Sequence, residues 1–245
     1  MTMVIFRDEE RIARMGRIAK IANFVGLAAL IVGFILAFTN MQSFSNLVLY
    51  QLTALGVGWL LSQVGIYLTQ RYLRQPRPDQ VLDDAVKKVA RNGRMYHFLL
   101  PAPHVLLTPE GIIVFNLKYQ GGQISAHGDK WKQRGVGLRK FFGQEGLGNP
   151  SREVEAMVQS LANYIRKNVP SVEEVPIGAM IVFTTKGVKD LDVKQSNIPA
   201  MHATKVKGFL RQKKREPLPQ ADYDALRAAF DAQAANLVEE QANDE

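Results

Sequence analysis

Two apolar stretches near the N-terminus constrain the fold of this chain more than any other feature. The first, residues 21–38, contains a single polar residue, Asn23, and the second covers residues 47–68. Each approaches the roughly 20 residues with which a helix crosses the hydrocarbon core of a bilayer. The sequence therefore predicts a membrane anchor, residues 1–75, made of two transmembrane helices and a short loop. Gly56 and Gly58 are expected to let the two helices approach each other closely.

Cations around the two stretches predict how the anchor is oriented. Five precede the first stretch and three follow the second, whereas residues 39–46 contain none: Arg7, Arg11, Arg14, Arg17, Lys20, Arg71, Arg74 and Arg77. Because loops rich in Lys and Arg stay in the cytoplasm, we expect a multi-pass protein of the cell inner membrane with both termini cytoplasmic. Three alternatives stay open: a cleaved signal peptide for the first stretch, a buried core helix for the second, and a homo-oligomer formed through the helices.

The segment 104–118, HVLLTPEGIIVFNLK, predicts a β-hairpin. Its turn is Thr108-Pro109-Glu110-Gly111, in which proline presets φ at the first turn position and glycine closes the turn. Both arms are apolar and rich in β-branched residues, which is typical of central strands covered on both faces. The second arm ends in a single cation, Lys118, two residues after Asn116.

The rest of the chain alternates helix and strand signals. Helices are expected at 79–92, at 151–168 with Ser151 as its N-cap, around Val206 and at 218–240. Strands are expected at 96–100, 123–126 and 175–183, with a loop at 135–150. This order predicts an α/β sandwich around a mixed sheet. We place this domain at residues 76–216 and an acidic C-terminal helix and tail at 217–245.

Residues 79–215 resemble the nuclease-related domain (NERD) family. The resemblance rests on the hairpin, on YQGGQI followed by Trp131, on GNP before the helix at 151 and on the apolar strand PIGAMIVF. It implies a restriction-endonuclease-like fold and metal-dependent cleavage of DNA with Mg²⁺ or Mn²⁺. In such a site carboxylates hold the cation, which activates water, and a lysine stabilises developing negative charge.

Carried over to this sequence, the site that the resemblance implies is incomplete. The Asp-His of the family reads Pro103-His104 here, and its Glu-x-Lys reads Asn116-Leu117-Lys118. Asp83 or Asp84 stands where the first helix supplies its acid. The residual site is thus Lys118, Asn116 and Asp84. Mg²⁺ sites depend on carboxylates, so the sequence favours an inactive nuclease-like domain without a bound metal.

Basic residues form two clusters suited to phosphate groups of nucleic acid or of anionic lipid, or simply to solvent. The clusters are Lys130, Lys132, Arg134, Arg139 and Lys140, and Lys205, Lys207 and Arg211, the latter continuing through 213–215. The chain has no cysteine, and the four histidines lack the spacing of a metal site.

Three functions are compatible with these features. The favoured one is a membrane-anchored domain with a degenerate nuclease site that binds DNA or a partner at the cytoplasmic face. The second is an active nuclease whose ligands have moved, with Asp84 or Asp129 as candidates. The third is a non-enzymatic membrane scaffold that uses its acidic C-terminal helix as the contact.

Overall fold

A computed structural model of the chain describes residues 3–39, 46–90, 92–137, 145–212 and 216–243. The chain divides into two compact units. One, here called the α/β unit, contains residues 1–10, 78–136 and 147–245. The other, the hairpin unit, contains residues 11–77 and 137–146.

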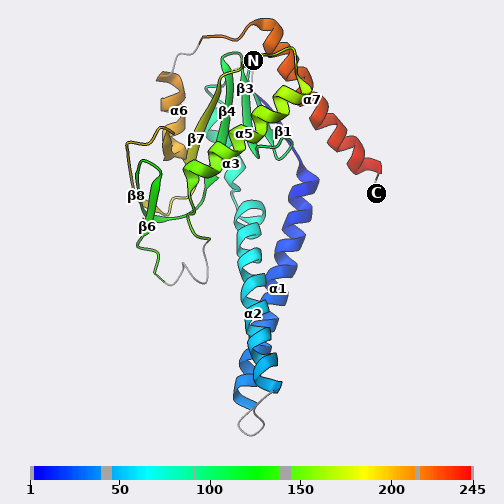
Figure 1. Cartoon of the computed structure of the whole chain (residues 1–245), viewed down its shortest axis with the longest axis vertical. Helices are drawn as coiled ribbons and strands as arrows, with labels where there is room; N and C mark the ends of the chain where they lie inside the picture. The colour runs from blue at the N-terminus through cyan, green and yellow to red at the C-terminus, as the bar shows by residue number, and fades with distance from the viewer. Residues whose placement is uncertain (1–2, 40–45, 91, 138–144, 213–215, 244–245) are drawn as a thin grey trace. The chain divides into compact units, whose positions relative to one another are not determined.

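The hairpin unit is dominated by two long helices. They are α1 (Glu9–Thr39) and α2 (Asn46–Leu68), the second continued by a π-helix, η1 (Thr69–Leu73) (Figure 1). Both are long and apolar enough to cross a membrane. Apart from Val4 and Ile5, all the exposed large apolar side chains of the described residues lie between Ile18 and Tyr67. The predicted connecting loop falls almost wholly outside the described residues.

Small residues bring α1 and α2 into close contact. A Cβ atom added to Gly58 would lie 2.9 Å from the carbonyl oxygen of Gly26, and one added to Gly65 would overlap Asn23. Asn23 also donates a hydrogen bond of 2.9 Å from Nδ2 to Oγ1 of Thr69. The predicted close approach is therefore confirmed at Gly58. It is wrong at Gly56, where an added Cβ would meet nothing within 4 Å, because this residue lies on another side of α2.

The α/β unit is built on a six-stranded mixed sheet in the order β1-β2-β3-β4-β7-β9. Its strands are β1 (Val4–Arg7), β2 (Arg94–His97), β3 (His104–Thr108), β4 (Gly111–Lys118), β7 (Ile177–Phe183) and β9 (Ala200–His202). The β1/β2, β4/β7 and β7/β9 pairs are parallel and the other two are antiparallel. The predicted mixed sheet is confirmed, whereas β1 was not predicted.

The predicted hairpin is confirmed as β3 and β4 at the centre of this sheet. Thr108 pairs with Gly111 across the turn, and Gly111 has a φ of 123°, which favours glycine. Every residue of β3 is buried, as is all of β4 except Leu117. Successive side chains of a strand point to opposite faces of the sheet, so β4 supplies residues to two separate cores.

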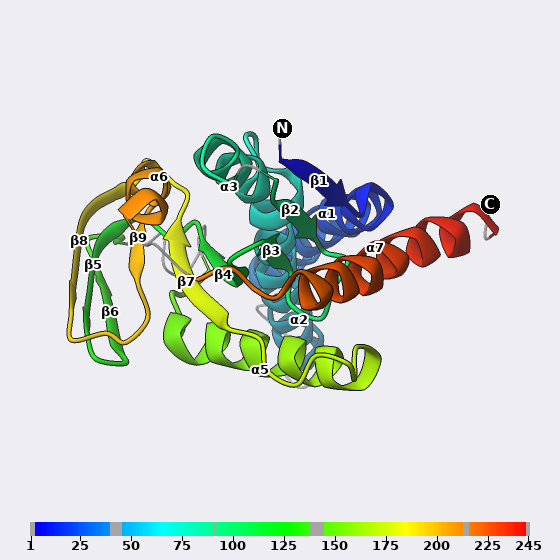
Figure 2. The same ribbon diagram turned by 90° about the horizontal axis from the view of Figure 1, so that it is seen from above.

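Two helices cover each face of the sheet (Figure 2). On one face α5 (Pro150–Asn168) and α7 (Gln220–Asn243) pack on Ile112 and Val114. On the other, α3 (Pro78–Val86) and α6 (Ala203–Gln212) pack on Ile113 and Phe115. The structure therefore has the layered α/β architecture that the sequence predicted.

A hydrogen-bonded cluster attaches α7 to β2, the second strand of the sheet. The hydroxyl of Tyr96 donates to Asp231 at 2.7 Å, and Arg94 Nη1 lies 2.7 and 2.8 Å from the two oxygens of the same carboxylate. Burial raises the pKa of Tyr96, and the bond to Asp231 raises it further. The phenol therefore stays protonated and keeps donating at neutral pH.

A second, three-stranded sheet has the order β6-β5-β8. Its strands are β5 (Gly122–His127), β6 (Lys130–Arg134) and β8 (Val188–Lys194). The helix after the glycine-rich loop begins one residue earlier than predicted. Asn149, not Ser151, is its N-cap, because the Asn149 side chain accepts a bond from the backbone of Arg152 and proline can occupy the first helical position.

Candidate functional site

Lys118 is buried at the end of β4, on the face of the sheet that α5 covers. Its side chain is only 4% exposed. Nζ donates to Oε2 of Glu153 at 2.6 Å and to the carbonyl oxygen of Leu147 at 3.1 Å. The ammonium is therefore both hydrogen-bonded and neutralised by a carboxylate.

Asn116 lies on the same face, because it is two residues before Lys118 in the strand. Its Nδ2 donates to Oε2 of Glu153 at 3.1 Å and to the carbonyl oxygen of Pro150 at 3.0 Å. Both partners are acceptors, which fixes the amide with its nitrogen toward α5. One carboxylate oxygen thus receives hydrogen bonds from both Asn116 and Lys118.

The N-terminus of α5 holds Glu153 in place. Asn149 caps the helix, Pro150 follows, and Glu153 falls in the first turn, where a negative charge interacts favourably with the helix dipole. Nε1 of Trp131 donates to the buried hydroxyl of Ser151 at 2.9 Å. The small sheet, through Trp131, therefore supports the same helix end that presents Glu153.

Asp84, the third predicted residue of this site, lies elsewhere. It is exposed on α3 and pairs with Lys87 one turn along the same helix. Since α3 covers the face of the sheet opposite α5, the structure brings Asn116 and Lys118 together but leaves Asp84 apart. Asp129, the other proposed ligand, is exposed in the turn between β5 and β6.

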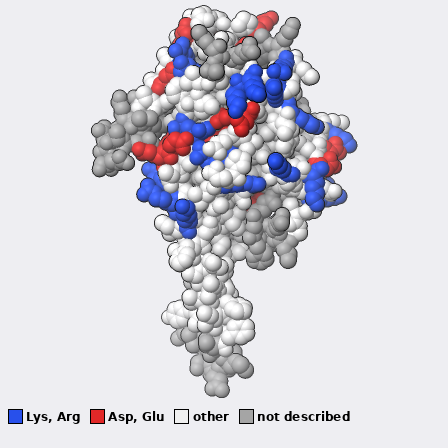
Figure 3. All heavy atoms as spheres, turned by 180° about the vertical axis from the view of Figure 1, so that it is seen from behind, with Lys and Arg blue, Asp and Glu red and all other residues white. Residues whose placement is uncertain are grey.

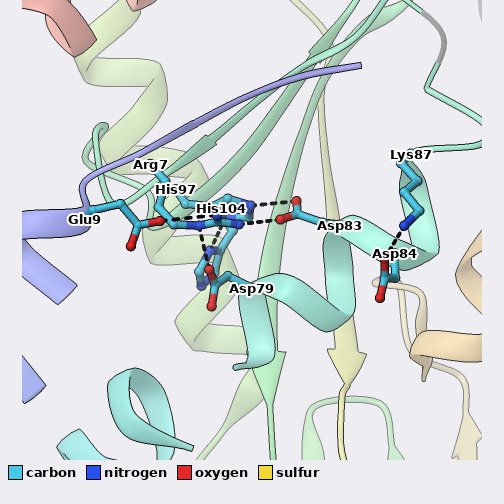
Figure 4. Close-up of polar contacts among 8 residues, drawn as sticks. All are labelled: Arg7, Glu9, Asp79, Asp83, Asp84, Lys87, His97 and His104. Carbon is cyan, nitrogen blue, oxygen red and sulfur yellow. Dashed lines mark hydrogen bonds and ion pairs between the residues drawn. The ribbon is translucent and has the colours of Figure 1, made fainter. Parts of the chain in front are cut away.

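The opposite face holds a second polar cluster, here called the Arg7 cluster: Arg7, Asp79, Asp83, His97 and His104 (Figure 4). Arg7 of β1 pairs with Asp79 and Asp83 of α3, and its Nε lies 2.8 Å from Oδ2 of Asp79. Oδ1 of Asp83 lies 2.9 Å from Nε2 of His97, and Nδ1 of His97 lies 2.9 Å from Nδ1 of His104.

The tautomers of the two histidines follow from these contacts. A carboxylate only accepts hydrogen bonds, so Nε2 of His97 carries the proton that is donated to Asp83. Nδ1 of the neutral ring is then an acceptor for the N–H of His104. These contacts join β1, α3, β2 and β3, and Nη1 of Arg7 also lies 3.4 Å from Oε1 of Glu9.

The donor set beside Lys118 does not fit the Mg²⁺ or Mn²⁺ ion that the family resemblance implies. Such ions take oxygen ligands and depend on carboxylates. Glu153 supplies one, but its Oε2 already accepts from an ammonium and an amide. Over the ranges that the structure describes, no group of three or more His, Asp or Glu side chains is arranged to hold a metal.

The predicted nucleic-acid-binding residues lie on two elements of the α/β unit. Lys130, Lys132 and Arg134 are exposed along β6, while α6 exposes Lys205 and Arg211 and half-buries Lys207. Arg139 and Lys140 lie outside the described residues, as do 213–215. Figure 3 shows Lys and Arg distributed in several groups, with acidic side chains between them.

The fold and the site together define an α/β domain in which a buried lysine lies at the end of the second strand of the central hairpin. Residues 65–184 match the family model of the nuclease-related domain (NERD), so this part of the chain is similar to that domain. The match starts inside α2 and ends after β7, so it includes the hairpin and α5. Comparison with curated proteins and with solved structures found no match.

Three residues of these clusters were not singled out from the sequence. The only sequence signal of Glu153 was its position three residues after Pro150, in the first turn of the predicted helix. Arg7 and Asp79 are far apart in sequence and flank the two apolar stretches. Only the pairing of β1 with β2 brings them together.

Proposed function

We propose that this protein is a membrane-anchored pseudoenzyme whose nuclease-related domain binds nucleic acid without cleaving it. One observation carries the proposal: the ammonium of Lys118 and the amide of Asn116 share the single carboxylate of Glu153. At such a site a metal ion would place a positive charge beside the carboxylate. Here the ammonium of Lys118 places that charge beside Glu153. The side chains around Lys118 therefore do not provide the oxygen ligands that metal-dependent cleavage requires.

Titration of metal ions tests the loss of the cation site. Mg²⁺ and Mn²⁺ are titrated calorimetrically into the full chain in neutral detergent micelles, as wild type, Asn116→Glu and the uncharged control Asn116→Gln. We expect no binding by the wild type or by Asn116→Gln, and millimolar binding by Asn116→Glu, because it adds a second carboxylate beside Glu153. Binding by the wild type would contradict the proposal.

A second candidate, an active nuclease with a moved ligand, is favoured by Glu153 itself. This carboxylate lies within 3.1 Å of the position where the family has its own, and its side chain is 37% exposed. DNA cleavage with Mn²⁺ that disappears in both Lys118→Ala and Glu153→Gln would establish this function. Absence of cleavage by the wild type over a screen of divalent metals would exclude it.

Membrane anchoring is the other part of the proposal. It is supported by the exposed apolar side chains along α1 and α2 and by the cations at one end of this pair. We place both termini in the cytoplasm and the 40–45 segment outside. The scaffold alternative has less support, since Asp231 of the C-terminal helix is already bound by Arg94 and Tyr96.

Single cysteines test the orientation, because the chain has none of its own. Ser43→Cys labels the predicted loop and Ser160→Cys labels the exposed side of α5. In intact spheroplasts we expect a membrane-impermeant maleimide to react with the cysteine at 43 and to reach the one at 160 only after lysis. The reverse pattern would overturn the proposed orientation.

A further inference from the structure

The outer face of the three-stranded sheet carries its charged side chains in parallel rows. Along β6, Lys130, Lys132 and Arg134 alternate with partly buried residues and are all exposed. Alternate residues of a strand lie about 6.6 Å apart, so the three cations form a straight row about 13 Å long. β6 is an edge strand of its sheet, which leaves one side of this row open.

Among the described residues, no carboxylate forms an ion pair with Lys130, Lys132 or Arg134. Lys194 on β8 differs, since its Nζ lies 3.0 Å from Oδ2 of Asp192. The β6 row therefore keeps its full charge for an external anion.

The β8 edge carries charges of both signs. The register puts three lines of side chains across the strands: Arg134, Gln123 and Asp190; Lys132, Ser125 and Asp192; and Lys130, His127 and Lys194. Lys194 pairs with Asp192, so β8, about 10 Å from β6, offers no second row of unpaired cations. The face therefore suits one phosphate backbone, along β6, and not two.

The same face exposes no Phe, Tyr or Trp side chain, and His127 is the one aromatic ring that the strands β5, β6 and β8 expose on it. Between the two charged edges, β5 exposes Gln123, Ser125 and His127. Trp131 is turned inward, where its ring lies near Phe183 and its Nε1 donates to Ser151. Contacts of this kind position a backbone and carry little information about base sequence.

The basic residues of α6 do not form a comparable row. With 3.6 residues per turn, Lys205 points to a different side of the helix from Lys207 and Arg211. Lys207 is in addition partly buried. Of the two basic clusters that the sequence indicated, the geometry favours the one on β6.

We infer that β6 is a track for the phosphodiester backbone of a single nucleic-acid strand, bound through Lys130, Lys132 and Arg134 without base recognition. The inference rests on the proposed nucleic-acid-binding function and specifies its ligand. The track is tied to the residual site, because Trp131 contacts the N-terminus of α5 and Nδ2 of Asn149 donates to the backbone of Asp129 at 3.2 Å.

The test is binding of labelled 20-nucleotide strands, one oligo(dT) and one of mixed sequence, and of a 20-base-pair duplex. The full chain is used in neutral detergent micelles, as wild type and as Lys130→Gln/Lys132→Gln/Arg134→Gln. A control, Lys88→Gln/Arg166→Gln/Lys167→Gln, removes the same number of exposed cations from other parts of the α/β unit. Fluorescence anisotropy is measured between about 50 and 200 mM salt, the range over which phosphate contacts alter affinity strongly.

We expect the wild type to bind both single strands equally and the duplex less tightly. Three lost phosphate contacts should weaken single-strand binding roughly 100-fold at 0.1 M salt and reduce the slope of log K against log salt by about 2. The control variant should bind like the wild type. Equal affinities of the β6 variant and the control, or tighter binding of the duplex by the wild type, would overturn the track.

Three further outcomes separate this inference from the proposed function and from lipid binding. If the wild type binds no nucleic acid, the proposed function fails and the track with it. If the wild type binds and the β6 variant is unchanged, only the track fails. If the β6 variant loses binding to phosphatidylglycerol vesicles but keeps its affinity for oligonucleotides, the row is a lipid-headgroup surface and the track is excluded.

Discussion

The two faces of the six-stranded sheet each hold a buried polar cluster, and the two differ in how they are closed. On the α5 face, Lys118 and Asn116 converge on Glu153, whose side chain is 37% exposed. On the α3 face, Arg7 pairs with two carboxylates, and Asp79 is only 1% exposed. The first cluster keeps one group in contact with solvent, while the second is almost completely enclosed.

This difference fits the residual site proposed at Lys118 and a structural role for the Arg7 cluster. The Arg7 cluster ties β1, which precedes α1, to α3, which follows the hairpin unit in sequence, and both to the sheet through His97. The Lys118 cluster occupies the hairpin position from which the family's chemistry is expected. Both clusters contain buried charges, so burial alone does not distinguish them. What distinguishes them is that solvent reaches the carboxylate of Glu153.

Removing Arg7 should have the largest effect. In Arg7→Ala the carboxylates of Asp79 and Asp83 lose their cation while remaining buried, which costs about 3–5 kcal/mol. We expect this loss in urea unfolding of the full chain in neutral micelles, followed by Trp131 fluorescence in a Trp59→Phe background. Arg7→Lys, which keeps the charge, should lose less. A loss below about 1 kcal/mol for Arg7→Ala would mean that the Arg7 cluster does not stabilise the attachment of β1 and α3 to the sheet.

Asp83→Asn should have the next largest effect. The variant keeps the size of the side chain but removes the charge that both Arg7 and His97 contact. Hydrogen bonds to charged groups contribute about 1.5–3 kcal/mol, so we expect a loss of about 2 kcal/mol in the same unfolding measurement. An unchanged midpoint would show that Asp79 alone balances Arg7.

The Lys118–Glu153 pair should be weaker, because solvent reaches the carboxylate. Glu153→Gln should cost about 1–2 kcal/mol, less than a fully buried pair. Lys118→Met combined with Glu153→Gln should recover part of the cost of Lys118→Met alone, and the double-mutant cycle measures this coupling. Strictly additive effects would indicate that the 2.6 Å contact contributes nothing to stability.

Asp84→Asn should have the smallest effect and is the matched control for Asp83→Asn. Its carboxylate is exposed and contacts only Lys87 of the same helix among the ion pairs described. Exposed pairs of this kind contribute about 0.3–0.5 kcal/mol, so the unfolding midpoint should barely change. A loss as large as that of Asp83→Asn would contradict the assignment of the two neighbours to different environments.

Local patterns were sufficient to predict much of the fold. The turn Thr108-Pro109-Glu110-Gly111, the two apolar arms and the apolar stretch before Phe183 all follow from short-range chemistry, and the structure has strands at each. The error at the start of α5 came from taking Ser151 as the N-cap, although Asn149, two residues earlier, is also a favourable capping residue. The helix at 79–92 was predicted too long, since α3 ends at Val86.

The site was harder to predict from the sequence, because it depends on which face of the sheet each helix covers. Alternation along β4 puts Asn116 and Lys118 on the α5 side, and nothing in the spacing of Asp83 and Asp84 shows that α3 covers the other side. Arg7 was assigned to the membrane anchor from its position before an apolar stretch. It lies on β1, which pairs with β2 about 90 residues later in the chain.

The sequence by itself determined which segments are apolar, where the chain turns and that the hairpin position 116 holds an amide instead of a carboxylate. These properties depend on single side chains and on neighbours a few residues apart, so they can be read from residue order. The tertiary structure alone decided that Glu153 meets Lys118, that Asp83 is enclosed while Asp84 is exposed, and that three cations align along β6. Those contacts join residues that only strand pairing and helix packing bring together, and that pairing depends on burying apolar surface across the whole sheet.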